Sequence, residues 1–202
     1  NDPYADTGER YEHRHDWRLG LRGHTQLSYM RSAPQSQVQW GELRFLFGGA
    51  TSTVGSGSAP GFLRNLDSAA NQQGLGQPSV HFETFPLDDA GGLQRDGNCD
   101  YGLVPDTAAS IAADPAYLPH VSEGIDAVTT APGVSDDLVL PQSAFIHSIA
   151  LKPPDYAQMA TDGTAVIWSP RSNVTLYGDT AVVTEAAHFG ALIALGTDWI
   201  LT

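Results

Sequence analysis

The ten residues TAVIWSPRSN, Thr164–Asn173, carry the clearest indication of the fold. The first five form a continuous apolar run, and such runs are typical of parallel strands that are buried on both faces of a sheet. A polar cluster, Ser169–Asn173, follows at once. We therefore expect a buried strand over residues 164–168 whose carboxyl end presents polar side chains.

The same pattern recurs on both sides of this stretch. Two further apolar runs each lead into a polar residue, namely residues 144–146 before His147 and residues 191–195 before Gly196-Thr197-Asp198. Helices are expected between them over residues 155–162 and 180–189, because each of these segments is followed by a glycine that can end a helix. Strands and helices that alternate at short spacing predict right-handed βαβ units and a parallel sheet, hence an α/β fold.

The amino-terminal part of the chain is less regular. Residues 1–37 are polar and show little periodicity, so they are expected to form an amino-terminal segment ahead of the main unit, residues 38–202. The apolar residues between Val38 and Phe47 favour a helix that packs against the rest of the protein. Residues 50–54 and 79–85 are further strand candidates.

Composition excludes several classes of function. The 202 residues are 41% hydrophobic, which suffices for a core, and carry a formal charge of −13. Such an acidic chain is a poor partner for nucleic acid or for an anionic membrane, because both require a positive protein surface. The single cysteine excludes a disulfide framework and a cysteine-based metal cluster. No leader or membrane-spanning run is visible, so we expect a cytoplasmic protein.

Polar residues fall where chemistry is expected. His147, the cluster at 169–173 and Asp198 each follow an apolar run, and His120 and Glu123 follow residues 116–119 in the same way. The carboxyl ends of parallel strands meet at one edge, so two imidazoles and a carboxylate would converge into an environment that suits a divalent metal. Taken singly, each residue also fits a helix cap, a packing histidine or a plain turn. The combination favours a site.

Several motifs resemble those of a known family. They are GGATS at 48–52, RNLD at 64–67, HVSEG at 120–124, IH at 146–147, VIWSPRSN at 166–173, LYG at 176–178 and ALGTDW at 194–199. In this order they resemble the amidohydrolase superfamily, in the branch that contains cytosine deaminase, guanine deaminase and the triazine hydrolases. The resemblance runs from about Trp17 onward. It implies a (β/α)8 barrel of the TIM type, of which this chain would supply about strands two to eight.

The resemblance also implies roles for individual residues. His120, His147 and Asp198 would bind one divalent metal, zinc or alternatively iron. Glu123 would shuttle a proton between water and the leaving nitrogen, with His147 and Asp198 assisting catalysis. Ser172, Asn173 and Trp199 would line the substrate pocket.

One departure from the family is large. The first barrel strand of the family ends in His-x-His, but the only such motif here is His13-Arg14-His15, and it follows the polar stretch Asp6–Glu12. We interpret it as a surface motif downstream of a missing strand; the alternative is that it substitutes for the missing ligands. The chain also ends four residues after Asp198, whereas a complete barrel takes about 250 residues. The sequence is therefore expected to be an internal segment.

The leading functional hypothesis is a metal-dependent hydrolase that attacks C–N bonds with metal-activated water. Its substrate would be a small molecule, either a nitrogen heterocycle or an amide, and it could form a homo-oligomer. A second hypothesis is a catalytically inactive barrel that serves as a binding or scaffold protein. A third is a short two-layer α/β protein that keeps the motifs as remnants.

Overall fold

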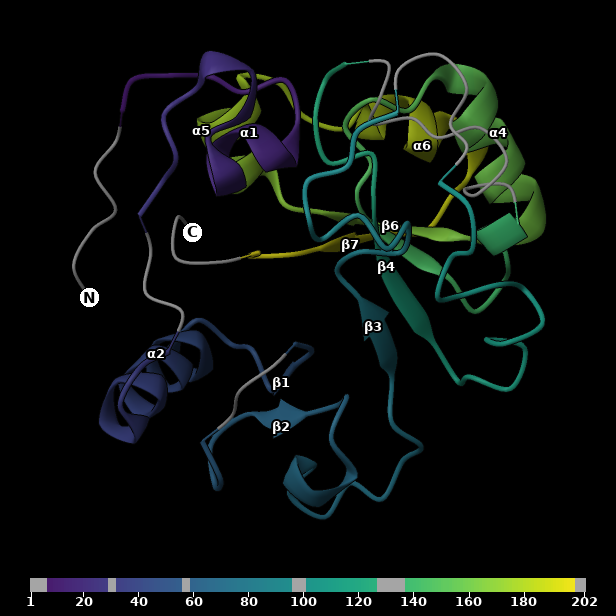
Figure 1. The fold of residues 1–202 in the computed structure, drawn as a ribbon. Coiled ribbons are helices and arrows are strands. Elements are labelled where there is room, and N and C mark those ends of the chain that lie inside the picture. The colour runs from purple at the N-terminus through teal and green to yellow at the C-terminus, as the bar shows by residue number, and fades with distance from the viewer. Residues whose placement is uncertain (1–6, 29–31, 56–58, 96–100, 127–136, 199–202) are drawn as a thin grey trace.

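The computed structural model of the protein describes residues 7–28, 32–55, 59–95, 101–126 and 137–198. Its central feature is a five-stranded parallel sheet (Figure 1). The strands lie in the order β3 (His81–Glu83), β4 (Tyr117–Val121), β5 (Ala144–His147), β6 (Ala165–Trp168) and β7 (Ile193–Leu195). Each strand pairs with the next along the chain, as in a barrel, whereas a doubly wound sheet reverses its order at a switch point. The prediction of a parallel α/β fold is confirmed.

Strand β4 extends further than the sequence pattern indicated. We expected the strand to end at Pro119, but it continues to Val121, so that His120 lies within the strand and pairs with Ile146 of β5. A proline removes one backbone donor and need not end a strand. The extension places His120 one pleat before the carboxyl end and leaves Glu123 in the loop beyond it.

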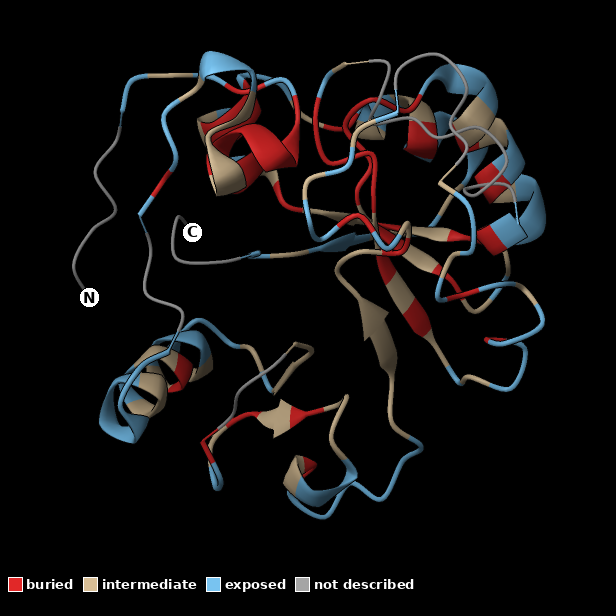
Figure 2. Ribbon diagram, viewed as in Figure 1, coloured by how far each residue is buried: buried red, intermediate tan, exposed pale blue. Residues whose placement is uncertain are grey.

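Two helices cover one face of the sheet and enclose the main core. Helices α4 (Pro153–Asp162) and α6 (Val183–Phe189) lie side by side above the strands in Figure 1. Figure 2 colours the ribbon red where residues are buried, and such stretches occur in the strands and in both helices. The buried residues of this core are Tyr117, Val121, Phe145 and Val166 from the sheet, Tyr156 and Met159 from α4, and Ala186 from α6. This core fixes the positions of the strand ends.

Two helices were not expected from the sequence. The motif SPRSN begins helix α5 (Pro170–Tyr177), because a proline fits the first helical position, where no N–H is required. Helix α1 (Arg14–Leu19) arises within the polar amino-terminal segment, where the ring of His13 caps the helix and Asp16 accepts a hydrogen bond from the His13 amide. A second apolar cluster, which includes Trp17, Leu176 and Tyr177, joins the two helices.

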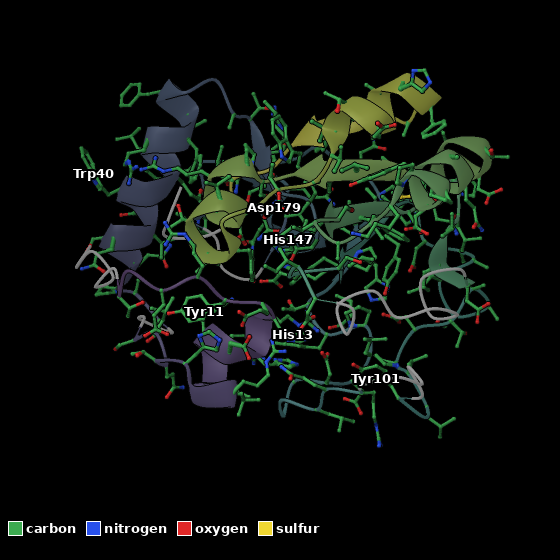
Figure 3. All side chains as sticks on the ribbon, turned by 90° about the horizontal axis from the view of Figure 1, so that it is seen from above. Tyr11, His13, Trp40, Tyr101, His147 and Asp179 are labelled. Atoms are coloured by element: carbon green, nitrogen blue, oxygen red, sulfur yellow. The ribbon has the colours of Figure 1, made fainter. Side chains whose placement is uncertain are left out.

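Helix α2 (Gln35–Phe47) contains the predicted helix, but its predicted packing is wrong. Trp40 is 61% exposed and Phe47 82% exposed, and Trp40 extends from the outer side of the helix in Figure 3. The helix is held instead through Glu42, whose buried carboxylate accepts hydrogen bonds from the amides of Ala59 and Leu63.

The remaining elements are short. Strands β1 (Ser52–Thr53) and β2 (Arg64–Asn65) form a separate parallel pair, and 3-10 turns occupy residues 21–23 and 69–71. None of the helices in the described ranges has both the length and the apolar character that are needed to cross a bilayer.

Candidate metal centre

Three potential metal ligands meet at the carboxyl end of the sheet. His120 comes from β4, His147 ends β5, and Asp198 follows β7. One ring nitrogen or carboxylate oxygen from each lies within 4.8 Å of the others, and the two imidazole centroids are 5.1 Å apart. The structure therefore brings together the three residues that the sequence grouped as candidate ligands, as expected for parallel strands.

Each imidazole is oriented by an acceptor on its Nδ1 atom. His147 donates from Nδ1 to Asn173 Oδ1 at 3.0 Å, while the amide nitrogen of Asn173 faces Thr180 Oγ1 at 3.4 Å. His120 donates from Nδ1 to the carbonyl oxygen of Glu83 at 3.2 Å. Because these oxygens only accept, a neutral ring carries its proton on Nδ1 and keeps a lone pair on Nε2. An acceptor on the far ring nitrogen is typical of metal-binding histidines.

An unpartnered nitrogen marks the centre of this group. Within the described residues, Nε2 of His147 is buried and makes no hydrogen bond. A buried polar atom without a hydrogen bond costs about 1–3 kcal/mol. A native structure therefore keeps such an atom where a bound ion or ligand interacts with it. Two imidazoles and one carboxylate are the donor set of a catalytic zinc site, so the residues present fit that metal.

Electrostatics agrees with this fit. The pKa of His120 is lowered to about 4, mainly by burial and also by a positive charge on His147, so His120 is neutral at pH 7. Burial of the carboxyl group raises the pKa of Asp198, although that residue is exposed as a whole. A positive charge on His147 opposes this rise, whereas the charge of Glu123 adds to it. A cation here would relieve the repulsion between the two carboxylates.

The backbone is strained at the same place. His147, Asp198 and Ser122 have φ angles of 74°, 63° and 53°, in the left-handed region that residues other than glycine seldom adopt. Each such residue costs on the order of 1 kcal/mol, and such residues cluster at functional sites, where the surrounding structure fixes them. All three follow or end a strand, where the chain turns its side chains toward the site.

Glu123 lies beside the three candidate ligands. Its Oε2 atom is 3.6 Å from Nε2 of His147 and 3.7 Å from Nη1 of Arg14. Burial raises the pKa of this carboxyl, but the charges of His147 and Arg14 outweigh burial and bring it to about 2. Glu123 is therefore ionised at neutral pH and can accept a proton.

Two of the other predicted site residues contact the candidate ligands. Asn173 holds His147, and Ser172 forms a hydrogen bond with Asp198; both are fully buried. Trp199 lies outside the described residues. No role was expected for Arg14 or Tyr177, although the LYG motif at 176–178 contains the tyrosine.

The His-x-His motif is buried, so its interpretation as a surface motif is wrong. His13, His15 and Asp89 form a second group of potential ligands, with His15 fully buried. Figure 3 shows His13 beside α1, apart from His147. The two histidines of the motif therefore lie close to Asp89 and do not join His120, His147 and Asp198.

Contacts within this second group indicate an ion-pair network. His15 Nε2 lies 2.9 Å from Asp89, and Arg18 Nη1 lies 2.7 Å from His15 Nδ1, so both ring nitrogens are occupied. Arg14 pairs with the same Asp89 carboxylate at 2.6 Å. The positive charge of two guanidinium groups beside these residues opposes the binding of a further cation.

Comparisons with known proteins point to a shared fold. No family profile matches the sequence, and no curated protein matches it significantly. A triazine hydrolase from Arthrobacter aurescens superimposes with a TM-score of 0.56 at 14% identity, covering 81% of this chain and 48% of its own. A variant of atrazine chlorohydrolase from A. aurescens TC1, complexed with zinc and atraton, gives 0.54 at 16% identity, with coverages of 81% and 48%. The zinc complex of that chlorohydrolase gives 0.52 at 16%, with coverages of 81% and 47%.

At these identities the likeness establishes the fold alone. The chain spans about half the length of the solved structures that it matches.

Proposed function

We propose that the chain carries the catalytic site of a metal-dependent hydrolase that acts on C–N bonds in nitrogen heterocycles or amides. The observation that carries this proposal is the buried, unpartnered Nε2 of His147, which converges with His120 and Asp198 beside an ionised Glu123. The likeness in fold to hydrolases, one of them complexed with zinc and atraton, supports it. The unreversed strand order supports the further proposal that these strands belong to a (β/α)8 barrel.

The roles follow from the contacts. His120 and His147 would hold one zinc through Nε2, with Asp198 as the carboxylate ligand. Zinc lowers the pKa of a bound water to about 7 and so supplies a nucleophile at neutral pH. Glu123 accepts a proton at Oε2 and delivers it to the nitrogen that leaves, so that ammonia or an amine departs neutral.

The neighbouring polar residues keep the ligands in place. Asn173 holds the tautomer of His147 that leaves Nε2 available, and Ser172 restrains the carboxylate of Asp198. Both therefore support the reaction through the ligands, in addition to any contact with the substrate.

A metal-binding experiment tests the proposed centre. Protein stripped with a chelator should take up one zinc per chain, measured by elemental analysis and titration calorimetry. Removing one ligand by His147→Ala should weaken zinc binding by at least a factor of about 10 to 100. His188→Ala is the matched control, since His188 is exposed on α6 and belongs to none of the groups of potential ligands. Equal losses in both variants, or no zinc in the wild type, would contradict the centre; parallel titration with ferrous iron decides between the metals.

A turnover experiment tests the reaction. Zinc-loaded protein should release ammonia or an amine from a panel of amino-triazines and aminopyrimidines. Glu123→Gln should keep its zinc and lower kcat by a factor on the order of 10² to 10⁴, the usual contribution of general acid–base catalysis.

A second candidate function is a catalytically inactive, binding version of the same site. It is favoured by the His-x-His motif, which pairs with Asp89 and adds no ligand to the first group. Zinc binding without turnover of any panel member would select this function over the hydrolase.

A further inference from the structure

We propose that Tyr177 is a positioning residue for Glu123, an inference that rests on the proposed hydrolase function. Tyr177 lies 2.8 Å from Glu123 Oε1, and Trp17 Nε1 lies 2.9 Å from the Tyr177 hydroxyl. The indole N–H can only donate, so the phenol oxygen accepts from Trp17 and directs its own proton to the carboxylate. The order of donors is therefore Trp17 to Tyr177 to Glu123.

Burial makes this chain of hydrogen bonds from Trp17 through Tyr177 to Glu123, here called the relay, rigid. Tyr177 is 2% exposed, and Trp17 and Glu123 are each 8% exposed. Burial and the negative charge of Glu123 raise the pKa of the Tyr177 phenol well above its ordinary value. The phenol therefore stays protonated, and a charge-assisted hydrogen bond to a buried carboxylate is among the stronger kinds.

The relay makes the two oxygens of Glu123 different. Oε1 accepts the proton of Tyr177, whereas Oε2 faces His147 Nε2 at 3.6 Å and Arg14 Nη1 at 3.7 Å, both beyond hydrogen-bond length. A carboxylate that is fixed through one oxygen cannot rotate the other away. Tyr177 thus presents Oε2 to the metal centre as the oxygen that takes up and releases the proton.

The amino-terminal segment also holds the backbone of the loop that carries Glu123. The Arg14 amide donates to the carbonyl oxygen of Glu123 at 3.2 Å, and His13 forms an isolated bridge with Gly124. Trp17 belongs to the same helix, α1. Side-chain and backbone contacts from one helix therefore hold the loop that carries Glu123.

The first test reads the relay directly in metal-free protein. The indole N–H resonance of Trp17 should shift in Tyr177→Phe, which removes its acceptor. It should also shift in Glu123→Gln, because a neutral amide polarises the intervening hydroxyl less than a carboxylate does. The matched control is Tyr156→Phe, which removes another fully buried hydroxyl, one bonded to the Ser148 carbonyl at 2.8 Å. An indole N–H resonance of Trp17 that has the same chemical shift in Glu123→Gln as in the wild type would overturn the relay.

The second test separates positioning from structural support. On a substrate identified by the panel, Tyr177→Phe should lower kcat by about 10- to 100-fold with KM within twofold and zinc content unchanged, because small misplacements of a catalytic group carry such costs. Tyr156→Phe should lower the melting temperature and leave kcat unchanged. Unchanged kcat in Tyr177→Phe, or a rise in KM alone, would contradict the assignment.

A further variant guards against misfolding of Tyr177→Phe. Trp17→Phe keeps an aromatic ring but removes the indole donor, and it should lower kcat several-fold with KM unchanged; an unaltered kcat in this variant would also count against the relay. Absence of zinc from the wild type would count against the proposed function, whereas the indole measurement would still decide whether Tyr177 holds Glu123.

Discussion

At the scale of single residues, His13 shows how burial changes the chemistry of a side chain. Its ring caps α1, and its pKa is lowered to about 3. Burial is the main cause, and charges on His15 and Arg14 add to it against the opposing effect of Asp89 and Asp16. In the unfolded chain a histidine has a pKa of about 6.5. Between these values the unfolded state binds more protons, so the contribution of His13 to stability is complete above about pH 6.5 and is lost as the pH falls.

His13→Asn should make the protein less sensitive to acid. Asparagine is a good helix cap but does not titrate. The free energy of unfolding of the wild type should fall by up to about 1.4 kcal/mol per pH unit more than that of the variant below pH 6.5, as measured by urea unfolding at about pH 7.5 and 5.5. His24, whose pKa is raised, contributes with the opposite sign but is present in both proteins. Parallel pH profiles would refute this role of His13.

Residue positions were predictable where they follow the strands. His120, Glu123, His147 and Asp198 were found because each follows or ends an apolar run in the sequence, and parallel strands bring such positions together. The relay through Tyr177 was missed, since a contact between residues 54 positions apart in the chain leaves no local pattern. The buried His-x-His motif was missed because charged groups can be buried when they pair with one another, and the partner Asp89 is distant in sequence.

At the scale of elements, the sequence predicted strands better than helices. Apolar runs located β5, β6 and β7 to within a residue or two, because buried parallel strands have few polar positions. Helix α5 was missed because Ser169, Pro170 and Asn173 favour turns in isolation, and the same residues can also begin a helix. The amphipathic appearance of α2 did not reveal that Trp40 and Phe47 would remain exposed.

The end of β7 depends on one glycine. A Cβ atom at Gly196 would lie 2.6 Å from Ser169 Oγ and 2.8 Å from Ile167 Cγ2, closer than real contacts allow. Gly196→Ala must therefore displace the strand end that leads to Asp198, and overpacking of this kind costs about 1–3 kcal/mol. We expect a lower melting temperature together with weaker zinc binding by calorimetry.

Another glycine supplies the control for this prediction. Gly41 lies within α2 with nothing within 4 Å of an added Cβ. Gly41→Ala should raise the free energy of unfolding by up to about 1 kcal/mol, because alanine favours helices, and should leave zinc binding unchanged. Weaker zinc binding in both variants would show that the loss does not arise at the end of β7.

At the scale of the whole molecule, alternating strands and helices predicted the parallel sheet, but not how the amino-terminal segment joins it. Helix α1 packs on α5 through Trp17 and Tyr177, and its ion pairs reach Asp89. The segment is polar in sequence, yet its Arg14 lies beside Glu123 at the candidate site. Such long-range pairing depends on the assembled fold, so no periodicity within residues 1–37 could reveal it.

Strand β7 is one of the two edges of the sheet, and we expect self-association there. Within the described residues β7 pairs only with β6, and it exposes Leu195 by 78%; Figure 2 shows the strand as exposed near its end. An unpaired strand with apolar side chains is a template for self-association, which a lysine on the edge opposes. Leu195→Lys should therefore reduce concentration-dependent self-association in sedimentation experiments. Leu103→Lys makes the same change of charge at a residue that is 97% exposed outside any strand, and it should have a smaller effect. Of these two residues, Leu195 alone lies on the edge strand β7. An equal effect of both variants would therefore show that the association depends on exposed apolar surface in general and not on the edge.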